Sequence, residues 1–227
     1  MNDPTTAVGA AAEPCSDCPR CPRLVDYRLR NRQAEPLWHN APVASFGAAD
    51  ARLLIVGLAP GVRGANRTGR PFTGDYAGDL LYATLIETGL ASGSYRADPA
   101  DGLALIDARI TNAVRCVPPQ NKPTPDEIAT CRDYLAATIR AMPRLRVILV
   151  LGRIAHQSTL AALGQRRAAF PFAHGARHDL APAATDARLG ALRLHCSYHC
   201  SRYNTQTRRL TPEMFKAVVQ RVRDELD

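Results

Sequence analysis

Residues 52–90 constrain the fold most, because a buried strand, a long glycine-rich loop and a helix follow one another there. Residues 53–56 are all apolar, which is typical of a strand covered on both faces of a sheet. A loop of about twenty residues follows, and then apolar residues recur at helical spacing up to Gly89. Such a long connection is usually functional in a compact domain, and parallel sheets bind ligands at the carboxyl ends of their strands. We therefore predict that this loop carries the active site.

Three more apolar runs, at residues 108–115, 147–151 and 191–195, predict further buried strands. Helices are predicted at residues 23–35, over the apolar positions from Leu80 to Leu90, after Thr124, between Gly152 and Gly164, and after Thr211. Strands that alternate with helices form a parallel sheet with helices on both faces, because the crossover connections are right-handed. We predict an α/β fold in which residues 15–227 form a single domain and residues 1–14 a disordered tail.

The composition narrows the class of protein. The net charge is +8, and of the 29 basic residues only Lys122 and Lys216 are lysines. Arginine matches phosphate oxygens in pairs, so this excess favours a nucleic-acid partner, although a GC-rich genome would also enrich arginine. The sequence has no apolar run long enough to span a membrane and no signal peptide at its start, which predicts a cytoplasmic protein. In that compartment seven cysteines indicate metal binding or catalysis before disulfides.

Four of the cysteines have spacings that suit a metal centre. Cys18 and Cys21 form a C-x-x-C pair, while Cys116 follows a predicted strand and Cys131 lies in the helix after it. Two such pairs suit four-thiolate zinc and an iron–sulfur cluster about equally, and the alternative for Cys131 is packing on an apolar helix face. Cys15 is an alternative ligand or a bystander. Cys196 and Cys200 favour packing over ligation.

The segments GLAPGVRGANRTGRPFTGD, PPQNKPTPDEIATC, LGRIA and SYHCSRYNTQTRRLT occur in that order. They resemble the family-5 (UDGb-type) uracil-DNA glycosylases from Cys18 to the last helix. The resemblance implies a three-layer α/β/α sandwich around a four-stranded parallel sheet, and an enzyme that removes uracil and other deaminated bases from DNA. It also implies a [4Fe-4S] cluster held by Cys18, Cys21, Cys116 and Cys131. Arg208 stands where a glycine is common in the family, and Cys200 replaces a more usual aliphatic residue.

Removal of a base from a duplex requires that the base first leave the stack. Phe72 is placed to stack on the extruded base, and its alternative role is core packing. Cleavage puts negative charge on the base, which the backbone amides of Gly57, Leu58 and Ala59 can stabilise. Positive charge develops on the sugar, and Asp75 is the carboxylate of the loop that can stabilise it or activate water. The alternative role of Asp75 is an N-cap of the following helix.

Three further polar residues are candidates for the pocket. His199, in the loop after the fourth strand, can donate a hydrogen bond to the base, although an exposed histidine or a phosphate contact is the simpler interpretation. Asn112 and Asn121 can each donate to and accept from a pyrimidine edge. Loop asparagines usually form turns, so only the resemblance favours Asn121.

The loop after the fourth strand also supplies candidate DNA contacts. Arg202, Arg208 and Arg209 can bind phosphates, and Tyr203 or Cys200 can fill the space that the base vacates. A Schiff-base mechanism needs an amine, and Lys122 is the one lysine in a loop near the predicted pocket. The resemblance gives Lys122 no such role, so we predict a monomeric, monofunctional glycosylase. The alternative is a non-catalytic or redox-sensing iron–sulfur protein that binds nucleic acid on the same fold.

Overall fold

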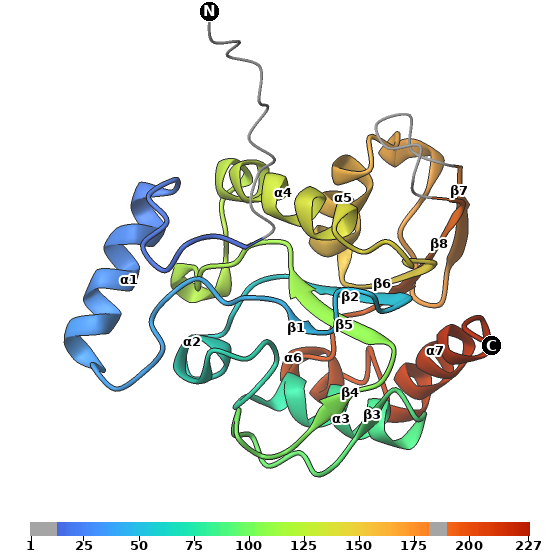
Figure 1. Cartoon of the computed structure of the whole chain (residues 1–227), viewed down its shortest axis with the longest axis horizontal. Helices are drawn as coiled ribbons and strands as arrows, with labels where there is room; N and C mark the ends of the chain where they lie inside the picture. The colour runs from blue at the N-terminus through green and yellow to red at the C-terminus, as the bar shows by residue number, and fades with distance from the viewer. Residues whose placement is uncertain (1–12, 182–189) are drawn as a thin grey trace, which may run out of the picture.

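The computed structural model describes residues 13–181 and 190–227. Its central sheet has six strands and lies between layers of helices (Figure 1). Their order is β1-β5-β2-β6-β8-β7. The strands are β1 (Phe46–Gly47), β2 (Leu53–Gly57), β5 (Ala108–Asn112), β6 (Val147–Leu151), β7 (Arg177–Leu180) and β8 (Leu192–Ser197). The inner four, β5-β2-β6-β8, are parallel, which confirms the predicted four-stranded parallel sheet. At the two edges β1 and β7 pair antiparallel with their neighbours.

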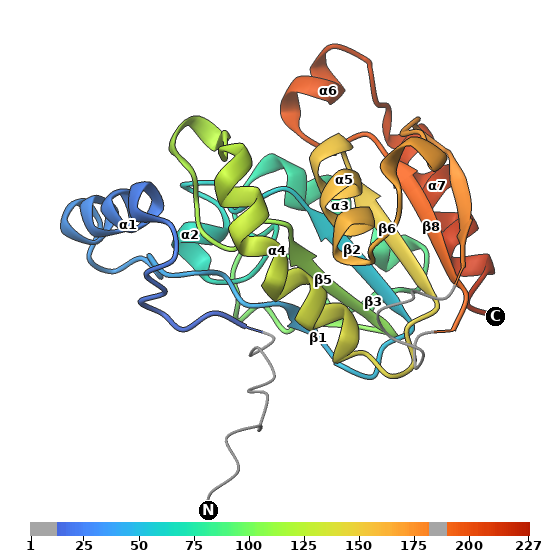
Figure 2. The same ribbon diagram turned by 90° about the horizontal axis from the view of Figure 1, so that it is seen from above.

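Helices cover both faces of the sheet and make the three layers (Figure 1). The larger helices are α1 (Pro22–Ala34), α3 (Tyr76–Glu87), α4 (Pro125–Arg140), α5 (Arg153–Ala162) and α7 (Pro212–Asp224). Shorter elements are α2 (Ala65–Thr68), α6 (Arg202–Gln206), the 3-10 turns η1 (Pro119–Asn121) and η2 (Arg167–Ala169), and the hairpin β3 (Ala91–Ser92) with β4 (Ala104–Leu105). Seen from above, α1 and α7 lie at opposite ends of the molecule (Figure 2).

The alternating side chains of β2 explain why its whole sequence is apolar. Leu53 and Ile55 pack into the core beneath α3 and α7, whereas Leu54 and Val56 pack into the core beneath α4 and α5. All four are fully buried. Burial of each side chain stabilises the fold by about 2 kcal/mol, which anchors this strand at its centre. Its last residue, Gly57, lies opposite Asn112 of β5, so the two chains leave the sheet side by side.

The start of α4 follows the sequence prediction. Thr124 accepts a hydrogen bond from the backbone N–H of Glu127, and the Glu127 carboxylate accepts one from the backbone N–H of Thr124. This reciprocal capping box satisfies two amides that the helix cannot pair by itself. Glu127 also accepts two hydrogen bonds from Arg23 at 2.7 Å, which joins α1 to α4.

Several boundaries differ from the sequence prediction. The strand expected at residues 108–115 ends at Asn112, and the loop expected after β8 contains α6. Of the predicted tail, residues 1–12 lie outside the described residues, but Glu13 forms ion pairs with Arg115 at 2.8 Å and with Arg109 at 3.3 Å. Glu13 is therefore part of the folded domain. Within residues 13–181 and 190–227, no helix is long and apolar enough to cross a membrane.

Candidate active site

One small pocket lies at the carboxyl ends of β2, β5 and β8. Its lining contains four side chains that the sequence singled out, Phe72, Asp75, Asn112 and His199, together with Ala59, Pro60, Gly61, Ala65 and Ala77. Gly57 lies against it, because a Cβ atom there would come within 2.4 Å of Asn112 Oδ1 and 2.5 Å of Phe72 Cζ. Leu58 lines the adjoining groove. Segments about forty residues or more apart in the sequence thus meet at one edge of the sheet.

Phe72 sits in a strained backbone conformation. Its φ angle is +54°, in the left-handed region that bulky residues avoid at a cost of about 1–3 kcal/mol. Tyr82 Oη donates to the Pro71 carbonyl at 2.6 Å, and Tyr95 Oη donates to the Phe72 carbonyl at 3.3 Å. The Phe72 ring faces His199 with centroids 5.8 Å apart and planes inclined by 26°. The strained backbone therefore holds an aromatic ring against the imidazole of the pocket.

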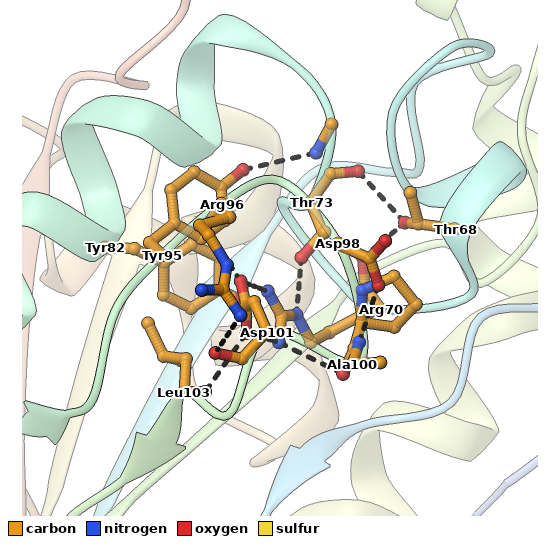
Figure 3. A network of polar contacts seen from close by, with 12 residues as sticks. Thr68, Arg70, Thr73, Tyr82, Tyr95, Arg96, Asp98, Ala100, Asp101 and Leu103 are labelled. Carbon is orange, nitrogen blue, oxygen red and sulfur yellow. Dashed lines mark hydrogen bonds and ion pairs between the residues drawn. The ribbon is translucent and has the colours of Figure 1, made fainter.

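A buried ion pair lies directly behind this loop (Figure 3). Both nitrogens at the end of the Arg70 guanidinium donate to the Asp101 carboxylate at 2.8 Å, and Arg70 Nε donates to Thr73 Oγ1 at 2.7 Å. Asp101 also accepts the backbone N–H groups of Arg96 and Leu103, at 2.9 and 3.0 Å. The sequence analysis did not identify this pair. It fixes the residues on both sides of Phe72.

Asp75 is the N-cap of α3, which was its alternative role in the sequence prediction, and it also lines the pocket. Its Oδ1 accepts the Gly78 backbone N–H at 3.2 Å, as an N-cap of α3. Its Oδ2 faces Gly61 and Gly64, where added Cβ atoms would approach to 2.9 and 2.3 Å. Burial raises the pKa of Asp75, and the backbone N–H groups of Gly78 and Ala77 partly oppose that shift. The carboxylate therefore caps a helix and still borders the pocket.

His199 and Asn112 supply complementary hydrogen-bonding groups. Burial lowers the pKa of His199 to about 4, so the ring is neutral at pH 7 and offers one N–H. Asn204 donates to the His199 backbone carbonyl at 2.8 Å and holds this loop. Asn112 Oδ1 is buried and has no hydrogen-bond partner among the described residues. An orphaned buried acceptor costs about 1–3 kcal/mol, so this oxygen is available to a donor that enters the pocket.

Asn121 is not brought to this pocket. It lies in the 3-10 turn η1, is exposed, and has a φ angle of +56° that suits a turn-forming asparagine. Lys122, the next residue, is also exposed. Of the two asparagines proposed to read the base, Asn112 is the one that lines the pocket.

A wider groove continues from the pocket and shares His199 with it. The sequence analysis missed most of its lining, which consists of Leu58, Leu151, Gly152, Arg153, Ile154, Ala155, Phe172, Tyr198, His199, Asn204 and Arg209. The Arg209 guanidinium lies over the Tyr198 ring, 4.6 Å from its centroid. The sequence did contain one indication that Arg153 lies at a ligand site. It follows Gly152 at the carboxyl end of a buried strand, where ligands bind in parallel sheets.

The remaining predicted DNA contacts lie on or near α6. The Tyr203 side chain is 72 % exposed, which is unusual for a large aromatic ring. Arg202 lies over the Tyr76 ring at 5.5 Å. Arg208 has a φ angle of +56°, and the glycine common at this position in the resembling family would adopt it without strain. Cys200 is buried and donates to the Ala77 carbonyl, so it is not available as a wedge.

The four cysteines chosen from their spacing line a single cavity. Cys18, Cys21, Cys116 and Cys131 meet there, between the start of α1, the loop after β5 and α4. The Arg115 backbone N–H donates to Cys131 Sγ at 3.3 Å, and Cys18 Sγ lies 3.5 Å from Tyr134 Oη. Burial raises the pKa of Cys21 to about 11 and that of Cys116 to about 12. Cys15 is exposed and does not line the cavity.

Known proteins resemble this chain in sequence over most of its length. The sequence profile described as the uracil DNA glycosylase superfamily matches residues 44–223. A type-5 uracil-DNA glycosylase of Thermus thermophilus is 47% identical over 208 residues, covering 89% of this chain and 90% of the relative. Relatives of the same description from Mycobacterium tuberculosis and Pyrobaculum aerophilum are 44% and 39% identical, covering 88% and 90% of this chain and 74% and 87% of their own lengths. This chain belongs to the uracil-DNA glycosylase superfamily.

Proposed function

We propose that this protein is a DNA repair enzyme that hydrolyses the N-glycosidic bond of uracil in DNA and leaves an abasic site. The observation that carries the proposal is the orphaned Asn112 oxygen in a pocket it shares with Phe72, Asp75 and His199. A non-catalytic nucleic-acid binder is not favoured, because relatives described as uracil-DNA glycosylases align over most of the chain. Other deaminated bases are proposed as further substrates.

Recognition uses the edge and the face of the flipped base. Uracil has an N3–H donor between two carbonyl oxygens, so Asn112 Oδ1 accepts the N3 proton and the amide nitrogen donates to one carbonyl. Stacking on Phe72 contributes about 1–3 kcal/mol, as base–aromatic contacts do in other single-strand complexes. The strained backbone of Phe72 is pre-organised for this contact, so little ordering is required when the base enters.

Bond cleavage separates charge between the base and the sugar. The neutral His199 N–H and the backbone amides of Leu58 and Ala59 donate to the carbonyl oxygen on which negative charge develops. The Asp75 carboxylate stabilises the cationic sugar and accepts a proton from the attacking water. The water oxygen bonds to C1′ as the C1′–N1 bond breaks, and the base leaves with the electron pair and is then protonated by solvent.

The groove beside the pocket supports the placement of DNA. Arg153 and Arg209 lie along it, and α6 presents Tyr203 next to it. We assign phosphate contacts to Arg209, Arg202 and Arg208. The exposed Tyr203 ring is the side chain that enters the space left by the base.

The cavity of four cysteines is assigned to a [4Fe-4S] cluster. All four thiols line one buried cavity between the start of α1, the loop after β5 and α4, and four cysteine thiolates are the ligands that hold such a cluster. The N–H donor on Cys131 and the Arg28 guanidinium 3.9 Å from Cys116 Sγ suit cluster sulfurs. The cluster would join the N-terminal segment to α4.

The direct test is to incubate the cluster-loaded protein with a duplex containing one uracil and then to heat it in alkali. We expect strand breakage at the uracil and none in the same duplex with thymine, because alkali cleaves only at an abasic site. If the uracil-containing strand stays intact after alkali although the protein binds that duplex tightly, the result would instead support the non-catalytic alternative. Without alkali the strand should remain intact, since the reaction needs no strand nicking.

The monofunctional mechanism has its own test. Lys216 pairs with Glu87 on the surface between α7 and α3, which leaves Lys122 as the candidate amine for a Schiff base. Borohydride added during turnover should trap no covalent adduct. An adduct that disappears in Lys122→Ala would refute the role given to water. The monomeric state and the cytoplasmic location of the protein remain predictions.

A further inference from the structure

A second group of metal-ligating side chains lies apart from the pocket and from the cysteine cavity. His156 of α5, His178 of β7 and Cys196 of β8 each contribute one donor atom, and these atoms all lie within 4.8 Å of one another. Within the described ranges, 13–181 and 190–227, no other group of three or more His, Cys, Asp and Glu side chains is this close. The sequence analysis favoured packing for Cys196, because the two histidines are brought to it only by the pairing of β7 with β8 and by α5.

His156 has hydrogen-bonding capacity that the protein does not use. The side chain is 2 % exposed, and neither Nδ1 nor Nε2 has a hydrogen-bond partner of good geometry among the described residues. Its ring meets Phe172 edge-on, at a centroid distance of 5.4 Å. Packing alone would favour a phenyl ring here, because buried ring nitrogens without a well-formed hydrogen bond are costly. An acceptor nitrogen directed at a cation would remove part of that cost.

The tautomer of His178 is set in the way that metal ligation requires. His178 Nε2 lies 3.0 Å from the Pro171 carbonyl oxygen. A carbonyl can only accept, so Nε2 carries the proton and Nδ1 keeps its lone pair. Histidines that bind metals commonly donate their other N–H to a backbone carbonyl in this manner. Arg153 is close enough to His156 to disfavour added positive charge, and the Cys196 thiolate would offset this.

We propose that His156, His178 and Cys196 bind one Zn²⁺ ion, with water as the fourth ligand. Two imidazoles and one thiolate are ligands that zinc prefers, and a tetrahedral site would need donor separations of about 3.5 Å. The three donor atoms already lie within 4.8 Å of one another. Binding releases the Cys196 thiol proton to solvent and changes no oxidation state. The ion would join the edge strand β7 and the helix α5 to β8. The site is independent of the proposed glycosylase activity.

The test uses the full-length, cluster-loaded protein after dialysis against a chelator. Added Co²⁺, a spectroscopic substitute for zinc, should produce a thiolate-to-cobalt absorption band in the difference spectrum. Zinc should then displace it, with about one zinc bound per chain. Cys196→Ala and His156→Phe should lose both signals and keep their iron. Cys200→Ala is the matched control, since it removes an equally buried thiol outside the group and should bind zinc normally.

Two results would overturn the proposal. The first is a wild-type protein that gives no thiolate–cobalt band, a result that does not depend on any variant folding. The second is zinc binding that persists in folded Cys196→Ala, which would place the ion elsewhere, including the cavity of Cys18 and Cys116. Neither result bears on uracil excision, so the failure of this proposal is distinguishable from failure of the proposed function.

Discussion

Asp101→Asn tests whether the ion pair behind the Phe72 loop holds the pocket in shape. The exposed fractions of the Arg70 and Asp101 side chains are 5 % and 0 %. Asparagine keeps the size of aspartate, but it removes the charge and turns one acceptor oxygen into a donor that faces Arg70. Loss of one partner from a buried pair costs about 3–5 kcal/mol, because the other charge is left uncompensated. We expect the lower end, because one oxygen of the side chain remains as an acceptor.

The thermal midpoint of the cluster-loaded protein is the suitable measure, since a protein with a bound cofactor need not unfold in one step. At roughly 2–4 °C per kcal/mol for a domain of this size, Tm should fall by about 10 °C. Uracil excision should fall with it at temperatures where the variant is still folded, because the backbone around Phe72 loses its support. Binding of undamaged DNA should change little.

Asp98→Asn is the matched control. It makes the same change in the same loop at an exposed carboxylate, which accepts a hydrogen bond from the Ala100 backbone N–H. A Tm loss for Asp101→Asn no larger than that of Asp98→Asn would refute the reasoning. So would normal stability combined with normal excision, since the pair would then neither stabilise the fold nor position Phe72.

The same pair predicts a pH dependence. The Arg70 guanidinium holds the pKa of Asp101 well below its usual range, although burial opposes this. A lowered folded pKa contributes stability that is complete above the unfolded value of about 4 and is lost as the pH falls through the folded value. The difference in Tm between wild type and Asp101→Asn should therefore be constant from about pH 5 to neutrality and should narrow only in stronger acid.

The other predictions concern single side chains. Asp75→Ala should lower the single-turnover rate by about 10²–10³ with uracil-DNA binding retained. It should also cost ~1 kcal/mol of stability, because it removes the N-cap of α3. Thr211→Ala is the matched control: it removes the N-cap of α7 at about the same cost and should leave the rate unchanged. Equal losses of rate and binding in Asp75→Ala would leave it a helix cap alone. Cys18→Ser should remove the brown colour and the iron, and Cys15→Ser should keep both, as iron analysis would show. Arg208→Gly should relieve about 1–2 kcal/mol of left-handed strain, more than the roughly 0.5–1 kcal/mol of added unfolded-state entropy, so Tm should not fall. In the same variant the affinity for DNA should drop and depend less steeply on salt; unchanged affinity would contradict a phosphate contact.

The sequence determined the features that depend on neighbouring residues. Apolar runs specified β2 and β6, because a strand buried on both faces must be apolar throughout. The Thr124 capping box located the start of α4. C-x-x-C spacing identified Cys18 and Cys21, and the ends of predicted elements identified Cys116 and Cys131, which meet the first pair in one cavity. The long loop after β2 correctly pointed to the residues that line the pocket.

The tertiary structure decided the features that depend on contacts between distant segments. Asn112 and Asn121 are equivalent by chemistry, and only the register of β5 beside β2 puts the first of them in the pocket. Arg70 and Asp101 are ordinary charged residues in the sequence, separated by a segment that contains α3 and β3. Only the folded chain brings them together out of water, where a buried charge needs an opposite charge beside it. The edge strand β7 is too short and too polar to be recognised alone, and it forms because β8 offers an unpaired edge. Local preferences act within a few residues, whereas these contacts exist only after the sheet has formed.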